Sequence, residues 1–101
     1  MSIEFLGSLK KSLTEDLADC LVKHIKNSPG LIVVREEPNS LGLCFTSGDG
    51  SSGQEQLTIT LSSEQIYVGF HAATRQQRER VLHAVRTALD TCGVSCDLEE
   101  E

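Results

Sequence analysis

The segment LTITLSSEQIYVGFHAATRQQRERVLHAVRTALDTC, residues 57–92, decides the fold. Apolar and polar residues alternate over 57–61 and again over 66–70. This is the period of half-buried β-strands, and the polar residues between them predict a turn. After Thr74 the apolar spacing changes to three and four residues, which predicts one long amphipathic helix ending at Cys92. A hairpin with one apolar face, followed by such a helix, supplies half of a hydrophobic core.

A first helix is predicted ahead of this segment. Ser12 and Glu15 have the spacing of a capping box, in which a hydroxyl and a carboxylate satisfy free backbone N–H groups. Apolar residues then recur at helical spacing, so we expect a helix from Leu9 or Leu13 to Lys26. The Pro-Gly pair that follows shortly afterwards is expected to end it.

Three further strands and a loop are predicted around these elements. Residues 31–35 and 41–46 are rich in apolar and β-branched residues, which predicts two strands joined by a turn at 36–39. The Gly- and Ser-rich residues 47–54 are expected to form a flexible loop. Alternation over 94–98 predicts a short last strand.

The predicted element order is α-β-β-β-β-α-β. Short connections between successive strands favour an antiparallel meander, and this segregation of helices from strands favours an α+β fold. We therefore expect a single α+β domain over residues 1–101, with both helices packed on one face of the sheet. Thr74 and Gln77 form a second predicted capping box.

The charge of the chain restricts its partners. Nine Lys and Arg residues stand against fifteen Asp and Glu residues, which gives a formal charge of −6. Such a chain is repelled by phosphate backbones and by anionic lipid, so we expect neither nucleic acid nor a membrane as a partner. No apolar run reaches the length of a membrane span, and no secretory signal is recognised, so we expect a cytoplasmic protein.

Four cysteines occur, at positions 20, 44, 92 and 96. In a reducing cytosol disulfides are not expected, and free cysteines are usually small buried hydrophobic residues. Cys20 and His24 are four residues apart, as are Cys92 and Cys96, so adjacent helices would bring four zinc ligands together. The spacing differs from that of zinc knuckles, and Cys20 and Cys92 lie on the apolar stripes. A core role is therefore the favoured interpretation, and no metal or cofactor is predicted.

Charged residues and one histidine are the candidate partner-binding residues. The set comprises Glu36, Glu37, His71, Arg75, Arg78, Glu99 and Glu100. Arg75 and Arg78 lie in the first helical turn, where the helix dipole disfavours cations, so a pairing such as Arg75 with Glu79, or a partner, must offset this cost. The glutamates at 99–101 are expected to form a solvated acidic tail.

Catalysis is not expected. His71 ends a predicted strand, but no orienting carboxylate with a nucleophile or metal is recognisable beside it, as a catalytic unit requires. An enzyme using His71 with Cys44 or a metal is the disfavoured alternative. The chain is therefore predicted to be a non-enzymatic protein-binding domain.

The segment IYVGFH, residues 66–71, followed by an amphipathic helix, a short strand and an acidic end, resembles small immunity proteins of bacterial contact-dependent and polymorphic toxin systems. The resemblance covers about residues 57–101, and after His71 the chain has Ala72 and Ala73 where many such proteins carry further aromatic or His residues. It implies an acidic cytoplasmic protein that binds one cognate toxin domain, commonly a nuclease, and occludes its active site.

A second class of protein is also compatible with the sequence. The chain resembles a small acidic secretion chaperone, which forms a homodimer and holds an unfolded export segment on apolar grooves. The predicted oligomeric state is therefore either a monomer or a homodimer.

Overall fold

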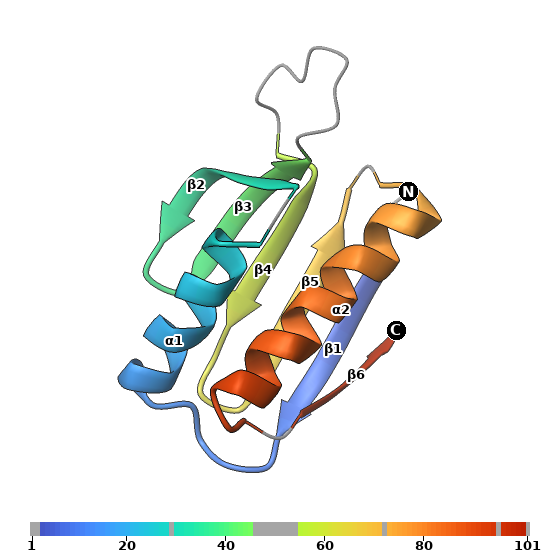
Figure 1. The fold of residues 1–101 in the computed structure, drawn as a ribbon. Coiled ribbons are helices and arrows are strands. Elements are labelled where there is room, and N and C mark those ends of the chain that lie inside the picture. Colours follow the sequence, from blue (N-terminus) through green and yellow to red (C-terminus); the bar gives the residue numbers. More distant parts are fainter. Residues whose placement is uncertain (1–2, 29, 46–54, 72, 95, 101) are drawn as a thin grey trace.

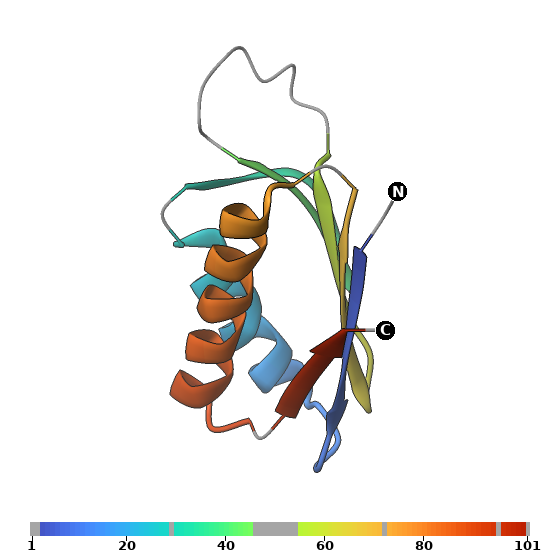
Figure 2. The ribbon, with the colours of Figure 1, turned by 90° about the vertical axis from the view of Figure 1, so that its right-hand side faces the viewer.

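One antiparallel sheet of six strands, covered on one face by two helices, makes up the described part of the chain (Figures 1 and 2). The computed structural model describes residues 3–28, 30–45, 55–71, 73–94 and 96–100. The elements in chain order are β1 (Ile3–Leu9), α1 (Glu15–Lys26), β2 (Leu31–Glu37), β3 (Ser40–Phe45), β4 (Leu57–Leu61), β5 (Gln65–Phe70), α2 (Arg75–Thr91) and β6 (Cys96–Glu100). The predicted α+β class and the placement of both helices on one face are confirmed.

The strand order across the sheet is β2-β3-β4-β5-β1-β6, and all neighbouring strands are antiparallel. Strands β2 to β5 form the predicted meander. The predicted order was wrong in starting with a helix, because β1 precedes α1 and lies between β5 and β6. Gly7 faces the core and Leu6 faces away from it. This interrupts the apolar alternation by which a half-buried strand is recognised.

Both helices are capped, but only the second is capped as predicted. In α1 the N-cap is Thr14, whose hydroxyl accepts a hydrogen bond from the Leu17 N–H at 3.2 Å. The predicted starts at Leu9 or Leu13 and the capping box at Ser12 are therefore wrong, although the end at Lys26 is confirmed. In α2 the Thr74–Gln77 capping box is present and Cys92 is the C-cap, both as predicted.

The residues before α1 form hydrogen bonds to other parts of the fold, so they cannot belong to the helix. Leu9 belongs to β1, and its N–H donates to the carbonyl of Glu64 at 2.8 Å. The Leu13 N–H donates to the carbonyl of Ser63, also at 2.8 Å. These bonds tie the connection to the β4–β5 turn and keep it out of the helix.

Several strand boundaries differ from the prediction. Strand β2 extends to Glu37 and β3 begins at Ser40, so the predicted turn at 36–39 is shorter. Strand β6 covers Cys96–Glu100 and not 94–98, and Glu99 and Glu100 pair with β1. These two residues therefore do not form a solvated tail, because β1 offers an edge to which their backbone can hydrogen-bond. The predicted loop at 47–54 and Glu101 lie outside the described residues.

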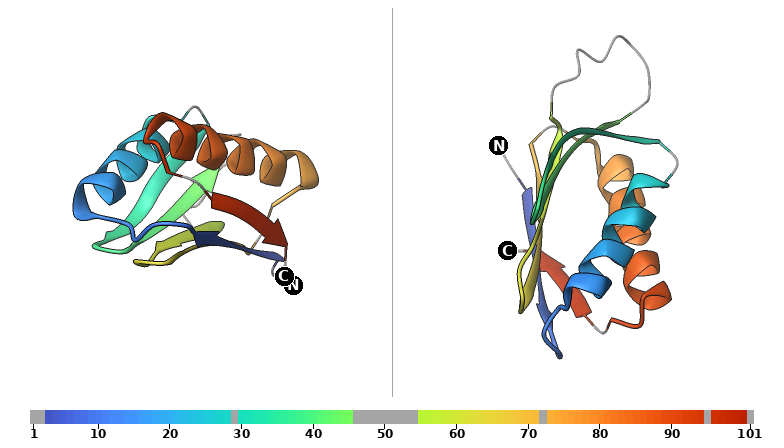
Figure 3. Two further views of the ribbon diagram at one scale, coloured as in Figure 1. Left: turned by 90° about the horizontal axis from the view of Figure 1, so that it is seen from below. Right: turned by 90° about the vertical axis from the view of Figure 1, so that its left-hand side faces the viewer.

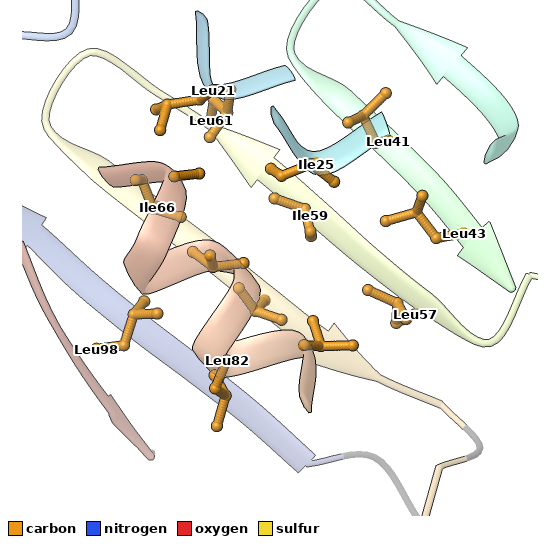
Figure 4. Close-up of a cluster of buried hydrophobic side chains, with 14 of the residues drawn as sticks. Leu21, Ile25, Leu41, Leu43, Leu57, Ile59, Leu61, Ile66, Leu82 and Leu98 are labelled. Atoms are coloured by element: carbon orange, nitrogen blue, oxygen red, sulfur yellow. The ribbon is translucent and has the colours of Figure 1, made fainter. Parts of the chain in front are cut away.

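The core fills the space between the sheet and the helices (Figure 4). Alternate residues of the strands and the apolar stripes of both helices supply it. Its buried members are Leu21, Ile25, Leu41, Leu43, Phe45, Leu57, Ile59, Leu61, Ile66, Val68, Phe70, Val81, Leu82, Val85, Ala88, Leu89 and Leu98. Phe5 packs edge-on against Phe70, with ring centroids 5.9 Å apart. Fully burying one such side chain contributes about 1.5–3 kcal/mol, so this layer dominates the stability.

A disulfide joins the two helices, contrary to the prediction. Cys20 of α1 is bonded to Cys92 at the end of α2, and their Cα atoms are 6.2 Å apart. The apolar stripes of the helices meet at this point, which brings together two residues 72 positions apart. Cys44 and Cys96 are free, and Cys44 is buried as predicted. Among the described residues, no helix is both long and apolar enough to cross a membrane.

Candidate functional site

No helix or strand among the described residues covers the face of the sheet opposite α1 and α2 (Figures 2 and 3). Side chains alternate between the two faces of a strand, so the neighbours of core residues point to this open face. One row of mutually paired residues crosses it, consisting of Arg35, Gly42, Thr58, Gly69 and Glu4. The next row consists of Glu37, Ser40, Thr60, Tyr67, Leu6 and Glu99. These two rows are mainly polar and charged, whereas Leu6 and the paired residues Ile32 and Cys44 add apolar side chains to the same face.

Two glycines allow larger side chains to lie flat on this face. A Cβ atom at Gly42 would collide with the carboxylate of Glu55, and one at Gly69 would lie 2.6 Å from the Tyr67 hydroxyl oxygen. The Tyr67 hydroxyl donates to Glu4 Oε1 at 2.6 Å. The missing side chains at the two glycines thus provide the space in which Glu55 and Tyr67 lie.

A hydrogen-bonded network surrounds Glu55. Arg35 approaches this carboxylate with two nitrogens, Nε at 2.8 Å from Oε1 and Nη2 at 3.3 Å from Oε2. The Thr58 hydroxyl donates to Glu55 Oε2 at 2.5 Å, and its oxygen lies 2.9 Å from His71 Nε2. Because the hydroxyl proton is directed to Glu55, Nε2 of His71 must be the donor to Thr58. Arg35 also pairs with Glu37.

This network keeps Glu55 ionised. The hydrogen bond from Arg35, followed by that from Thr58, lowers the pKa of Glu55 below its ordinary value of 4.5. The same carboxylate raises the pKa of Arg35. A carboxylate with a lowered pKa, paired with a guanidinium, is a weak base and not a proton donor at neutral pH. The Thr58 proton points to this weak base and not to His71, so the arrangement differs from an activated nucleophile.

The open face of the sheet carries an excess of negative charge. The two rows, Glu55, and Asp97, which pairs with Ser8 in the next row, place five carboxylates (Glu4, Glu37, Glu55, Asp97 and Glu99) against Arg35 on the open face, a net charge of −4 with His71 neutral. Helix α2, on the other side, carries four arginines against two carboxylates, a net charge of +2. An acidic face of this kind attracts a basic partner before contact.

The predicted partner-binding residues do not form one surface. Glu37, His71 and Glu99 lie on the open face. Glu36 pairs with Leu41, a core residue, so it points to the helix side, where its carboxylate lies 2.6 Å from Lys26 Nζ. Glu100 pairs with Phe5 and takes the helix side of β6.

Two arginines of the predicted set belong to α2. Arg75 pairs with Glu79 at 3.4 Å, the pairing expected from the sequence. Arg78 Nη1 donates to the carbonyl of Ala73 at 3.1 Å. Both interactions are local to the start of the helix, and both place positive charge on the side of the molecule opposite the acidic face.

Sequence reasoning missed four members of the open face. Arg35 belongs to β2, Glu55 and Thr58 to the segment at the start of β4, and Tyr67 to β5, so the pairing of these strands brings three separate segments together. One available signal was the pair of polar positions at Thr58 and Thr60, because both belong to the face that the core leaves free. Cys44, considered with His71 as a possible catalytic pair, is buried with 1% of its surface exposed, so its thiol is not open to a substrate.

Apart from the open face, a groove lies between the two helices. Its volume is about 890 Å³. His24 lines it from α1, Arg80 and His83 line it from α2, and Leu31 and Phe45 contribute apolar surface from the sheet. Near it, the ligand atoms of Cys20, His24 and Cys92 lie within 4.8 Å of one another. This three-residue group is the potential metal-ligand set among the described residues.

Comparisons with protein-family models, with curated proteins and with solved structures found no match. The function of this protein therefore has to be inferred from its geometry.

Proposed function

We propose that this protein is a non-enzymatic binding domain that docks a basic protein partner on the open face of its sheet. The observation that carries the proposal is the open face, on which carboxylates are held in fixed positions around Arg35 and Tyr67. We further propose that it acts in the cytoplasm as an immunity protein, which neutralises a cognate toxin domain, a nuclease, by occluding its active site.

Electrostatics supplies the attraction. A nuclease presents cationic side chains where it binds phosphates, and a surface with a net charge of −4 is complementary to such a site. The negative charge of the open face attracts the cationic site of the nuclease before contact. The carboxylates can occupy the positions of substrate phosphates, so inhibition requires no chemistry by this chain.

Preorganisation supplies affinity. Binding is weakened by the cost of ordering flexible side chains at an interface. Here Glu55 is already held by Arg35 and Thr58, and Glu4 by Tyr67. Tyr67 also lies over Gly69 and offers a flat aromatic surface, a type of residue enriched at interfaces.

The test uses charge reversal on one side of the molecule at a time. Binding of purified basic nuclease domains from contact-dependent toxins is measured by calorimetry at low and high salt, and protection is measured by nuclease assay. For a nuclease that binds the wild type, the double variant Glu37→Lys/Glu99→Lys should bind at least about tenfold more weakly, a change of about 1.4 kcal/mol. The salt dependence should fall with it, because fewer opposite charges meet.

A matched control carries the same change in net charge on the helix side. Asp16 and Asp19 are exposed residues of α1, and Asp16→Lys/Asp19→Lys should leave binding nearly unchanged. Equal losses in the two double variants would contradict docking on the open face. Absence of binding to every nuclease tested would contradict the toxin-inhibitor assignment.

The secretion chaperone is the second candidate, and the groove between the helices favours it. A groove with Leu31 and Phe45 among its apolar surfaces can hold an extended peptide segment. A chaperone should be a homodimer by light scattering and should retain an unfolded segment. Its binding should respond to changes in the groove and not to Glu37→Lys/Glu99→Lys.

A further inference from the structure

The group formed by Cys20, His24 and Cys92 combines three metal-ligating side chains at the contact between the helices. Cys20 and His24 are one helical turn apart, so both lie on the same face of α1. Cys92 is the C-cap of α2. The two cysteines are half-buried and His24 is exposed. The Cys20 sulfur and the His24 imidazole on one face of α1 therefore lie close to the Cys92 sulfur at the C-terminal end of α2.

The separations in this group fit a zinc ion. Tetrahedral zinc binds sulfur at about 2.3 Å and imidazole nitrogen at about 2.0–2.1 Å, which places neighbouring ligand atoms roughly 3.5–3.8 Å apart. The three ligand atoms already lie within 4.8 Å of one another, and the cysteine Cα atoms are 6.2 Å apart. Rotation of the side chains after reduction is sufficient to reach zinc geometry, without movement of the helices.

We propose that the reduced protein binds Zn²⁺ through Cys20 Sγ, Cys92 Sγ and a ring nitrogen of His24, and that the disulfide and the metal are alternative ways of joining α1 to α2. Thiolate and imidazole ligands together suit zinc among the common cellular metals. Cys96, a fourth possible ligand in the sequence, belongs to β6. Its sulfur lies beside Gly7 of β1, and it is not part of the group. Three protein ligands leave a fourth coordination position for water.

The exchange between the two states balances as follows. A cellular dithiol gives two electrons and two protons to the Cys20–Cys92 bond, which breaks into two thiols while the dithiol becomes a disulfide. Zn²⁺ then displaces the two thiol protons, forms two Zn–S bonds and accepts the lone pair of neutral His24. The proposal is independent of the proposed immunity function, because the group and the open face lie on opposite sides of the sheet.

The experiment measures metal binding to the full chain in both redox states. The protein is reduced with a phosphine, freed of metal and titrated with Zn²⁺ against a chromophoric chelator. Co²⁺ then reports the ligands through its thiolate charge-transfer band. We expect one equivalent of zinc per reduced chain and none per disulfide-bonded chain. His24→Ala should weaken zinc binding by more than about 10-fold, since even the loss of an outer-shell partner costs that much.

Matched variants separate this site from adventitious binding. His83→Ala changes another histidine that lines the groove, and Cys96→Ser removes a thiol outside the group. Both should leave the stoichiometry and the affinity unchanged. Cys20→Ser should abolish the charge-transfer band, and because His24 is exposed, His24→Ala gives a test even if the cysteine variant fails to fold. Zinc binding that is absent from the reduced protein, survives His24→Ala at full affinity, or is lost in Cys96→Ser would overturn the proposal.

Discussion

The two faces of the sheet are held by different kinds of interaction. On the covered face, apolar side chains pack against α1 and α2, and a disulfide joins the helices. On the open face, hydrogen bonds and ion pairs connect side chains that remain accessible: 37% of the Arg35 side chain and 27% of the Glu55 side chain are exposed. Ion pairs at such exposure contribute about 0–1 kcal/mol. The covered face thus supplies most of the stability of the fold, and the ordered polar side chains of the open face add little to it.

The largest effect is expected from breaking the link between the helices. Cys20→Ser in metal-free, oxidising buffer should lower the free energy of unfolding by about 4 kcal/mol, because the crosslink no longer closes a loop of more than 70 residues in the unfolded chain. Urea unfolding followed by circular dichroism measures this loss. The reduced, metal-free wild type is the control and should show a similar midpoint. Identical midpoints for oxidised and reduced wild type would contradict the prediction.

Neighbouring residues of β4 give the sharpest contrast between the faces. Ile59 is buried with 1% exposed, and Ile59→Ala should cost about 3 kcal/mol through lost burial and the cavity left behind. Thr60→Ala, on the open face next to it, should cost about 0.5 kcal/mol or less. Both values come from chemical denaturation at neutral pH. Comparable losses at the two positions would mean that the open face also contributes to a core, for instance through a partner copy.

A smaller effect is expected at Gly42, where the open face is most closely packed. Gly42→Ala places a Cβ against the Glu55 carboxylate, so the bond with Arg35 must break or shift. The expected loss is about 1 kcal/mol, typical of one hydrogen bond. A double-mutant cycle with Glu55→Ala checks the cause, because the two losses should not add. Full additivity would show that Gly42→Ala acts elsewhere.

The smallest effect is a pH dependence that belongs to the open face alone. The pKa of Glu55 is lower in the folded chain than its ordinary value of 4.5. Its contribution is therefore complete above about pH 4.5 and is lost as the pH falls through the folded-state pKa. The difference in unfolding free energy between wild type and Glu55→Gln should be below about 1 kcal/mol at pH 7 and should shrink toward pH 3. The cost of Ile59→Ala should stay constant over the same range.

The sequence predicts elements well where short-range pattern and capping agree. The hairpin of β4 and β5 and the helix α2 follow from two- and four-residue spacing and from the Thr74 cap. Strand β1 was not predicted, because Gly7 occupies a core-facing position and breaks the apolar alternation. The strands that pair with β1, β5 and β6, also lie far from it in the sequence. The strand conformation of Glu99 and Glu100 was not predicted for a related reason: glutamate has a low strand propensity, and pairing with the distant β1 outweighs it.

The candidate site depends on long-range order in the same way. Arg35 and Glu55 are 20 residues apart, Thr58 and His71 are 13 apart, and Cys20 and Cys92 are 72 apart. Local spacing could place Cys20 beside His24 on one helix, but it could not show which cysteine lies opposite. The prediction that disulfides are absent failed because it followed from an assumed compartment and not from the distance between the thiols.

Side-chain period and composition are sufficient to predict the α+β class, the meander, the second helix with its cap and the excess of acidic residues. Neighbouring residues carry both signals. Long-range packing is needed to show that β1 and β6 complete the sheet, that five carboxylates lie on its open face, and that Cys20, His24 and Cys92 meet. The physical reason is that strand register and helix packing minimise exposed apolar surface over the whole chain, and the polar side chains are carried to wherever that packing leaves them.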